Sequence, residues 1–233
     1  MPDRMVELLA IATAILSLAA AVAFWLGFAA REVKGTTGAA VKTASTGLLA
    51  LLALGQAAAL APGGWFWLVP LGLALGALGD LMLALGGIGR FLAGVAAFGL
   101  GHLAYAGGFL WRGAELGFDG VSRGEGLMLV LLLVLLTSTE IWLAPRTGEL
   151  RQPVRGYVGL IGLMGATALL LPAQAGQGAL RAGAGLFILS DLLLALQLFV
   201  VKDAGWRRLA LALWPAYWAG QALILWGAIL HAG

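Results

Sequence analysis

Residues 66–88, FWLVPLGLALGALGDLMLALGGI, form an apolar run in which Asp80 is the single charged residue. Its length matches the roughly 20 residues that a helix needs to cross a bilayer. A second apolar run carries Asp191 in a nearly identical setting, since GDLMLAL at 79–85 returns as SDLLLAL at 190–196. A carboxylate at bilayer depth costs at least about 2.5 kcal/mol on insertion scales. Two of them in matching settings therefore predict one functional site.

The composition predicts an all-α, polytopic integral membrane protein. Of 233 residues, 61% are hydrophobic and only 11% are charged, and the mean hydropathy is +0.97. This length accommodates about eight spans in a single transmembrane domain, residues 1–233. The first apolar segment is longer than a signal-peptide core and is expected to remain as a helix. Charged, proline and glycine residues place the spans near 5–30, 43–61, 66–88, 91–111, 125–143, 153–172, 179–201 and 208–230.

The charged and sulfur-containing residues exclude several classes of site. The chain has no cysteine, so it has no thiolate zinc site, iron–sulfur cluster or disulfide. Its net charge of +3 arises from arginines and lysines in the connections, and no basic run indicates a nucleic-acid partner. The expected partners are membrane lipids and a lipid substrate.

The basic residues also predict the orientation. Four lie in one set of connections and ten in the other: Arg4, Arg112, Arg123 and Arg181 against Arg31, Lys34, Lys42, Arg90, Arg146, Arg151, Arg155, Lys202, Arg207 and Arg208. The positive-inside bias then places the odd-numbered connections in the cytoplasm and both termini outside, in the inner membrane of a bacterium. With this orientation Asp80 and Asp191 lie at similar depth, roughly 12–15 Å from the cytoplasmic helix ends.

The spacing of the two aspartates indicates an internal repeat. They lie 111 residues apart, about half the chain and four spans, which predicts two parallel four-helix halves, 1–116 and 117–233. Convergence of leucine- and alanine-rich helices on a similar string is the alternative explanation.

Further polar residues are expected in the same half of the membrane. His102 and Tyr105 lie about one helical turn apart, and Tyr217 and Gln221 share a face next to Pro215, which frees a backbone carbonyl. Hydrogen bonding between helices would explain such residues equally well. The candidate residues that position substrate or water are His102, Tyr105, Tyr157, Ser190, Tyr217 and Gln221. Lys42 and Arg155 are expected at helix starts, where they either contact a lipid phosphate or anchor the helix ends.

Two carboxylates in a poorly hydrated pocket suit acid–base chemistry. A close pair is expected to share one proton near neutral pH, so that one aspartate is the acid and the other the base. This suits cleavage of an acid-labile bond through an oxocarbenium-like state, with neither cofactor nor metal. It equally suits a proton-coupled transporter of lipids or small solutes. A third alternative is a metal-dependent hydrolase with Asp80, Asp191 and His102 around one ion.

The order of the motifs resembles that of the YhhN-like membrane family, which includes the lysoplasmalogenases. In that family a proline commonly follows the lysine that corresponds to Lys42, whereas this chain has Thr43 at that position. The resemblance spans nearly the whole chain, through Lys42, Gly79-Asp80, Phe91, Gly94, Phe98, His102, Tyr105, Tyr157, Ser190-Asp191, Tyr217 and Gln221.

The resemblance implies hydrolysis of the vinyl-ether bond of lysoplasmalogens, which releases a fatty aldehyde and glycerophospho-ethanolamine or -choline. Asp80 and Asp191 would be the catalytic acid and base. Lys42 or Arg155 would hold the lipid phosphate, and the other polar residues would orient water and the carboxylates.

Overall fold

The computed structural model describes residues 2–31, 35–60, 63–201 and 205–232. Within these ranges the chain forms helices joined by short connections and contains no strand, which confirms the predicted fold class. The α-helices are α1 (Pro2–Gly27), α2 (Gly35–Leu60), α3 (Leu68–Leu85), α4 (Ile88–Leu116), α5 (Arg123–Trp142), α6 (Arg151–Leu169), α7 (Gln177–Phe199) and α8 (Gly205–Ala232). Short 3-10 helices in the connections are η1 (Gly64–Trp67), η2 (Ala144–Arg146) and η3 (Gly148–Leu150).

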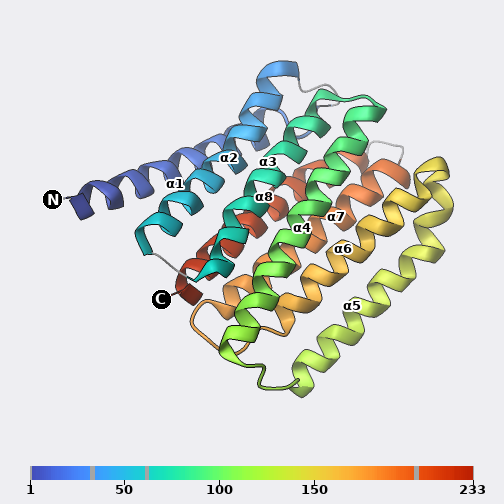
Figure 1. The fold of residues 1–233 in the computed structure, drawn as a ribbon. Helices are drawn as coiled ribbons and strands as arrows, with labels where there is room; N and C mark the ends of the chain where they lie inside the picture. The colour runs from blue at the N-terminus through green and yellow to red at the C-terminus, as the bar shows by residue number, and fades with distance from the viewer. Residues whose placement is uncertain (1, 32–34, 61–62, 202–204, 233) are drawn as a thin grey trace.

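Seven of the described helices are long and apolar enough to cross a membrane, and α6 is the exception. The first five residues of α6 include Arg151, Gln152 and Arg155, which shortens its apolar part. It nevertheless packs between α4, α5 and α7 inside the bundle (Figure 1). The chain is therefore a polytopic membrane protein. Lys34 and Lys202, two of the basic residues used to predict its orientation, lie outside the described residues.

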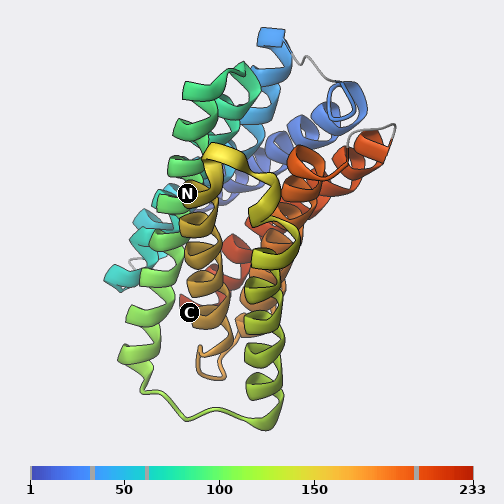
Figure 2. The ribbon, with the colours of Figure 1, turned by 90° about the vertical axis from the view of Figure 1, so that its right-hand side faces the viewer.

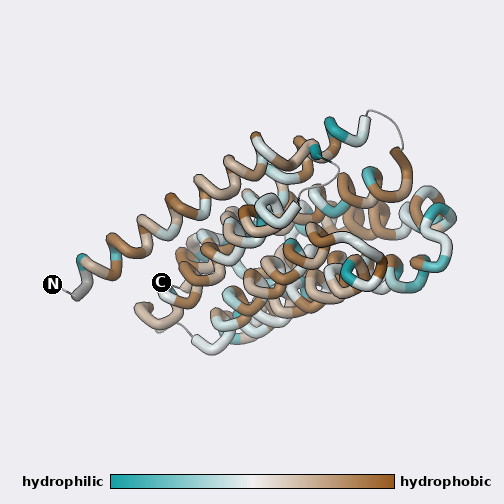
Figure 3. The backbone as a smooth tube through the Cα atoms, turned by 90° about the horizontal axis from the view of Figure 1, so that it is seen from above, coloured by the Kyte–Doolittle hydropathy of each residue, from teal (hydrophilic) through white to brown (hydrophobic). Residues whose placement is uncertain are grey.

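The helices at the two edges of the bundle present apolar side chains outward. α1 contacts α2 and α8 at one edge, and α5 contacts α6 at the other (Figure 1). Figure 2 shows α5 on the outer face, and none of its residues is buried. Hydrophobic positions recur along α1 from its N-terminal end (Figure 3). These edges suit contact with lipid chains, because their outward-facing side chains are apolar and need no water around them.

The turn that follows α3 fixes the position of Asp80. Gly86 and Gly87 have φ of +69° and +88°, a backbone conformation that favours glycine, and they connect α3 directly to α4. α3 therefore packs against α4 along its length. Asp80 lies in the last two turns of α3, and Asp191 lies in the C-terminal half of α7.

The start of the second helix differs from the prediction. α2 begins at Gly35, so Lys42 lies two turns inside the helix, and the predicted start near residue 43 is wrong. The residues before Lys42 are small, and Gly38 and Ala39 are buried. Because small residues allow close helix packing, the helix continues through a stretch that its low hydropathy marked as a connection.

The carbonyl freed by Pro215 is satisfied by a side chain of a neighbouring helix. Proline removes the N–H that would bond to Leu211, and the Trp25 indole donates to the Leu211 carbonyl at 2.9 Å instead. The Trp214 indole donates to the Ala21 carbonyl at 2.9 Å. These two hydrogen bonds fasten α1 to α8.

Candidate active site

Asp191 on α7 is the first of two buried acidic centres. Its Oδ2 accepts a hydrogen bond from the Tyr157 hydroxyl at 3.3 Å and lies 3.4 Å from His102 Nε2. His102 Nδ1 lies 2.6 Å from the Phe98 carbonyl oxygen, which only accepts, so Nδ1 carries a hydrogen. His102 Nε2 thus faces the Asp191 carboxylate. Residues from α4, α6 and α7 together build a centre that suits proton exchange.

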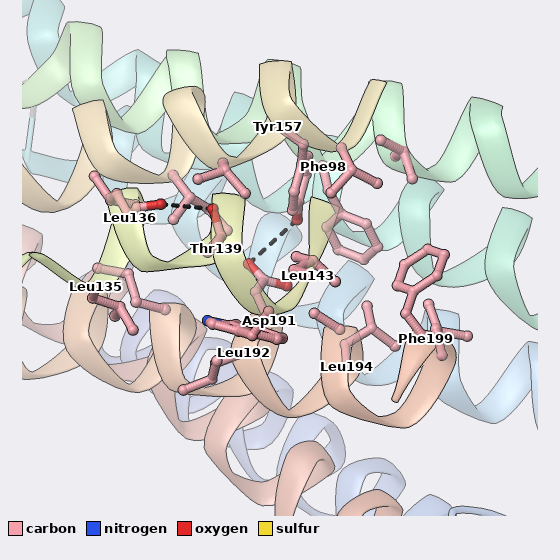
Figure 4. A pocket seen from close by; sticks show the side chains of 18 of the residues that line it. Phe98, Leu135, Leu136, Thr139, Leu143, Tyr157, Asp191, Leu192, Leu194 and Phe199 are labelled. Atoms are coloured by element: carbon pink, nitrogen blue, oxygen red, sulfur yellow. Dashed lines mark hydrogen bonds between the residues drawn. The ribbon is translucent and has the colours of Figure 1, made fainter. Parts of the chain in front are cut away.

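Asp191 lies in the wall of an apolar pocket formed by α3 to α7. In Figure 4 the Asp191 carboxylate and the Tyr157 hydroxyl point toward each other within this pocket. The Asp191 side chain is 12% exposed and that of His102 only 1%, so Asp191 reaches the pocket while His102 lies behind it. Most of the lining is aliphatic or aromatic and includes Phe98, Leu136, Ile161, Ile188, Leu194 and Phe199. Such a lining suits a hydrocarbon chain.

Asp80 on α3 is the second acidic centre. Lys42 Nζ lies 3.0 Å from its Oδ1, while the Thr46 and Tyr217 hydroxyls donate to its Oδ2 at 2.8 and 2.9 Å. The Asp80 carboxylate is 1% exposed. A buried charge of this kind needs an opposite charge close by, and Lys42 supplies it. In the structure the Lys42 ammonium therefore pairs with Asp80, and its contact with a lipid phosphate stays a prediction.

Two more predicted residues extend the Asp80 centre. Gln221 Nε2 donates to the Tyr217 hydroxyl at 3.4 Å, and the Tyr105 hydroxyl donates to Gln221 Oε1. All three side chains are buried. Tyr105 and His102, predicted on one helix face, therefore serve different centres: Tyr105 joins the Asp80 network, and His102 turns to Asp191.

Aromatic rings lie between the two centres. The Phe187 ring centroid is 4.6 Å from that of His102 and 5.3 Å from that of Tyr217, and the Phe98 ring packs edge-on against Phe187. Within the described part of the chain, no hydrogen bond or ion pair joins Asp80 to Asp191. The structure thus differs from the expected single proton shared directly by the two carboxylates, because each carboxylate has its own polar partners.

Glycines on α3 make room for these side chains. A Cβ at Gly72 would lie 2.5 Å from the Tyr105 ring, and one at Gly79 would lie 2.6 Å from the Phe98 ring. A Cβ at Gly76 would lie 2.6 Å from Gln221 Nε2 and 3.2 Å from the Tyr217 hydroxyl. Besides helix packing, these glycines therefore provide space for the polar network.

Replacing Gly76 with alanine is expected to lower the free energy of unfolding by about 1–3 kcal/mol, because the methyl group displaces Gln221 and Tyr217. Thermal unfolding in detergent measures the effect. Gly55→Ala is the matched control, since a Cβ at Gly55 on α2 meets nothing within 4 Å. Equal stability of the two variants would contradict the prediction.

The remaining predicted residues lie outside both networks. The Ser190 hydroxyl donates to the Phe187 carbonyl of its own helix at 2.7 Å. Arg155 Nε donates to Glu140 Oε1 at 2.7 Å on the surface between α5 and α6. No group of three or more histidine, aspartate or glutamate side chains able to hold a metal ion occurs among the described residues. Asp80, Asp191 and His102 are therefore not arranged as a metal-binding triad.

Thr46 and Phe187 belong to the two centres but were not predicted from the sequence. Thr46 follows Lys42 by four residues and so shares its helix face, which is the signal that could have identified it. Phe187 carries no such signal, because one more aromatic residue in an apolar helix is uninformative until its neighbours are known.

The fold and this geometry define a polytopic helical membrane protein with a carboxylate in an apolar pocket. The YhhN family matches residues 37–228, and the chain belongs to that family. Similar proteins are named lysoplasmalogenase in Mycobacterium bovis and Mycobacterium tuberculosis, each 32% identical over 164 residues, and lysoplasmalogenase TMEM86A in Bos taurus, 33% identical over 165 residues.

The alignments cover 69% of this chain for the mycobacterial proteins and 68% for the bovine one. The chain spans about three fifths of the length of these relatives, 59% and 63% respectively. No solved structure matches it.

Proposed function

We propose that this chain is a membrane-embedded lysoplasmalogenase. It would cleave the vinyl-ether bond of a 1-alkenyl-glycerophosphoethanolamine or -choline to a fatty aldehyde and a glycerophospho headgroup. The observation that carries the proposal is the Asp191 carboxylate, which accepts a hydrogen bond from Tyr157 and lies beside His102 in the wall of an otherwise apolar pocket. The names of the similar proteins support the same reaction.

The pocket supports a lipid with a single chain as the substrate. Its aliphatic and aromatic walls accept a hydrocarbon chain, and Asp191 is placed where it can meet the polar end of that chain. Val154 lines the pocket and is followed by Arg155, at the end of the bundle that holds the α5–α6 connection. In this proposal Arg155 holds the lipid phosphate by exchanging part of its pairing with Glu140.

The reaction needs two proton transfers at one place. A carboxylic acid first gives its proton to the outer alkenyl carbon, which leaves an oxocarbenium ion at the carbon bonded to oxygen. Water then attacks this carbon and loses a proton to a carboxylate, and the resulting hemiacetal collapses to aldehyde and alcohol. Tyr157 and His102 hold the Asp191 carboxyl in one orientation for these steps.

The excess of basic residues supports a cytoplasmic location for the connections between α5 and α6 and between α7 and α8. We extend the proposal accordingly: the pocket faces the inner leaflet of a bacterial inner membrane, and both termini lie outside.

The experiment that tests this function uses detergent-purified full chain and mass spectrometry. We expect free fatty aldehyde and glycerophosphoethanolamine from 1-alkenyl-lysophosphatidylethanolamine, in the presence of chelator, and no product from the ester analogue. A folded, monodisperse protein that forms no aldehyde would refute the hydrolase. Transport of the same lipid between vesicle leaflets would then be the function to measure.

A further inference from the structure

The two acidic centres are built in the same way. The Thr46 hydroxyl donates to Oδ2 of Asp80, and the Tyr157 hydroxyl donates to Oδ2 of Asp191. In both pairs the donor precedes the aspartate by 34 residues and lies on the preceding helix, α2 before α3 and α6 before α7. The two hydroxyl donors thus occupy corresponding places in the two predicted halves of the chain.

The second partner of each aspartate comes from the opposite half. Tyr217 on α8 reaches Asp80, and His102 on α4 reaches Asp191. α4 and α8 are each the fourth helix of a four-helix half, 1–116 and 117–233. Each half therefore supplies an aspartate with its hydroxyl donor, and also one residue that completes the centre of the other half. This relation is expected of a duplicated unit.

One contact breaks this equivalence. Lys42 Nζ lies 3.0 Å from Oδ1 of Asp80, whereas the polar contacts of Asp191 with the described residues, from Tyr157 and His102, go to its Oδ2. Lys42 precedes Thr46 by four residues, and the residue four before Tyr157 is Pro153, which has no side-chain donor. The Asp191 side chain is accordingly 12% exposed at the pocket, against 1% for Asp80.

We infer that the two centres are copies of one acid–base site, of which only the Asp191 copy reacts with substrate. This inference rests on the proposed function. Lys42 neutralises Asp80 and occupies the oxygen that would meet a substrate, so the Asp80–Lys42 pair supports the helix packing and exchanges no proton with the lipid. Asp191 Oδ1, which has no such counter-ion, is the reacting atom.

Asp191 then performs both proton transfers. Its protonated carboxyl gives the proton to the outer alkenyl carbon and becomes a carboxylate. The same carboxylate takes a proton from the water that attacks the oxocarbenium carbon, which restores the acid. One water is consumed for each vinyl ether cleaved, and no second carboxyl is required.

The first test removes the ion pair as a unit. Lys42→Met and Asp80→Asn each leave one buried partner unmatched, so each single variant is expected to lower the midpoint of thermal unfolding. The double variant K42M/D80N removes both charges and is expected to restore that midpoint. Its rate of aldehyde release should remain within about threefold of the wild-type rate, with the same pH profile.

The second test adds a positive charge next to Asp191. Pro153 lies in the first turn of α6 and is exposed, so a lysine is tolerated there. Pro153→Lys is expected to bring an ammonium to Asp191, as Lys42 does to Asp80, and to lower activity by at least about tenfold. Pro153→Met is the control, with a side chain of similar length and no charge.

These outcomes separate the inference from the proposed function. Wild-type protein without activity refutes the lysoplasmalogenase itself. Active wild type together with a folded K42M/D80N variant that loses activity at least about 100-fold, or that loses one limb of the pH profile, overturns the inference. If the double variant does not fold, Pro153→Lys decides: activity equal to that of Pro153→Met overturns the equivalence of the two centres.

Discussion

Replacing Asp191 with asparagine is expected to slow aldehyde release by about 10²–10⁴-fold while the protein stays folded. Asparagine has the same shape as aspartate and keeps an oxygen that accepts from Tyr157, but it transfers no proton. Initial rates with 1-alkenyl-lysophosphatidylethanolamine measure the loss. Size-exclusion chromatography and thermal unfolding establish that the variant is folded.

The matched control is Asp119→Asn, which makes the same chemical change at an exposed residue of the α4–α5 connection. It should retain the wild-type rate. A folded Asp191→Asn variant with more than about a tenth of the wild-type rate would contradict the proposal that this carboxyl reacts with the lipid.

Replacing Gly183 with valine is expected to destabilise the fold by about 3 kcal/mol or more. A Cβ at this position on α7 would lie 2.7 Å from the Ile224 nitrogen and 2.8 Å from the Gly220 carbonyl oxygen of α8. Backbone atoms cannot rotate away, so the two helices must separate. Asp191 lies on α7 and Tyr217 on α8, so activity should fall with stability.

Gly185→Val provides the control for this prediction. It introduces the same β-branched side chain into the same helix two residues later, where a Cβ meets nothing within 4 Å. Thermal unfolding midpoints of the two variants in one detergent give the comparison. Equal midpoints would show that contact between the α7 and α8 backbones does not limit stability.

The sequence predicted several features that depend on few residues. Hydropathy and length predicted the helices, and a lone carboxylate in each of two apolar runs identified Asp80 and Asp191, because charge within a bilayer is too unfavourable to be incidental. The start of α2 was missed because its first residues are small and only weakly apolar, so packing rather than hydropathy makes them helical.

What the tertiary structure decided is the pairing of these groups. Lys42 and Arg155 are both basic residues beside apolar segments, yet one is buried against Asp80 and the other pairs with Glu140 at the surface. His102 and Tyr105 lie one turn apart but contact different centres.

The sequence by itself therefore determined that the chain is a helical membrane protein with a carboxylate in each of two apolar helices, since local composition and period set both. Only the packing of α2, α4, α6 and α8 around α3 and α7 decided which carboxylate is neutralised and which opens to the pocket. The physical reason is that a charge–charge contact depends on distances between residues far apart in the chain, which no local pattern encodes.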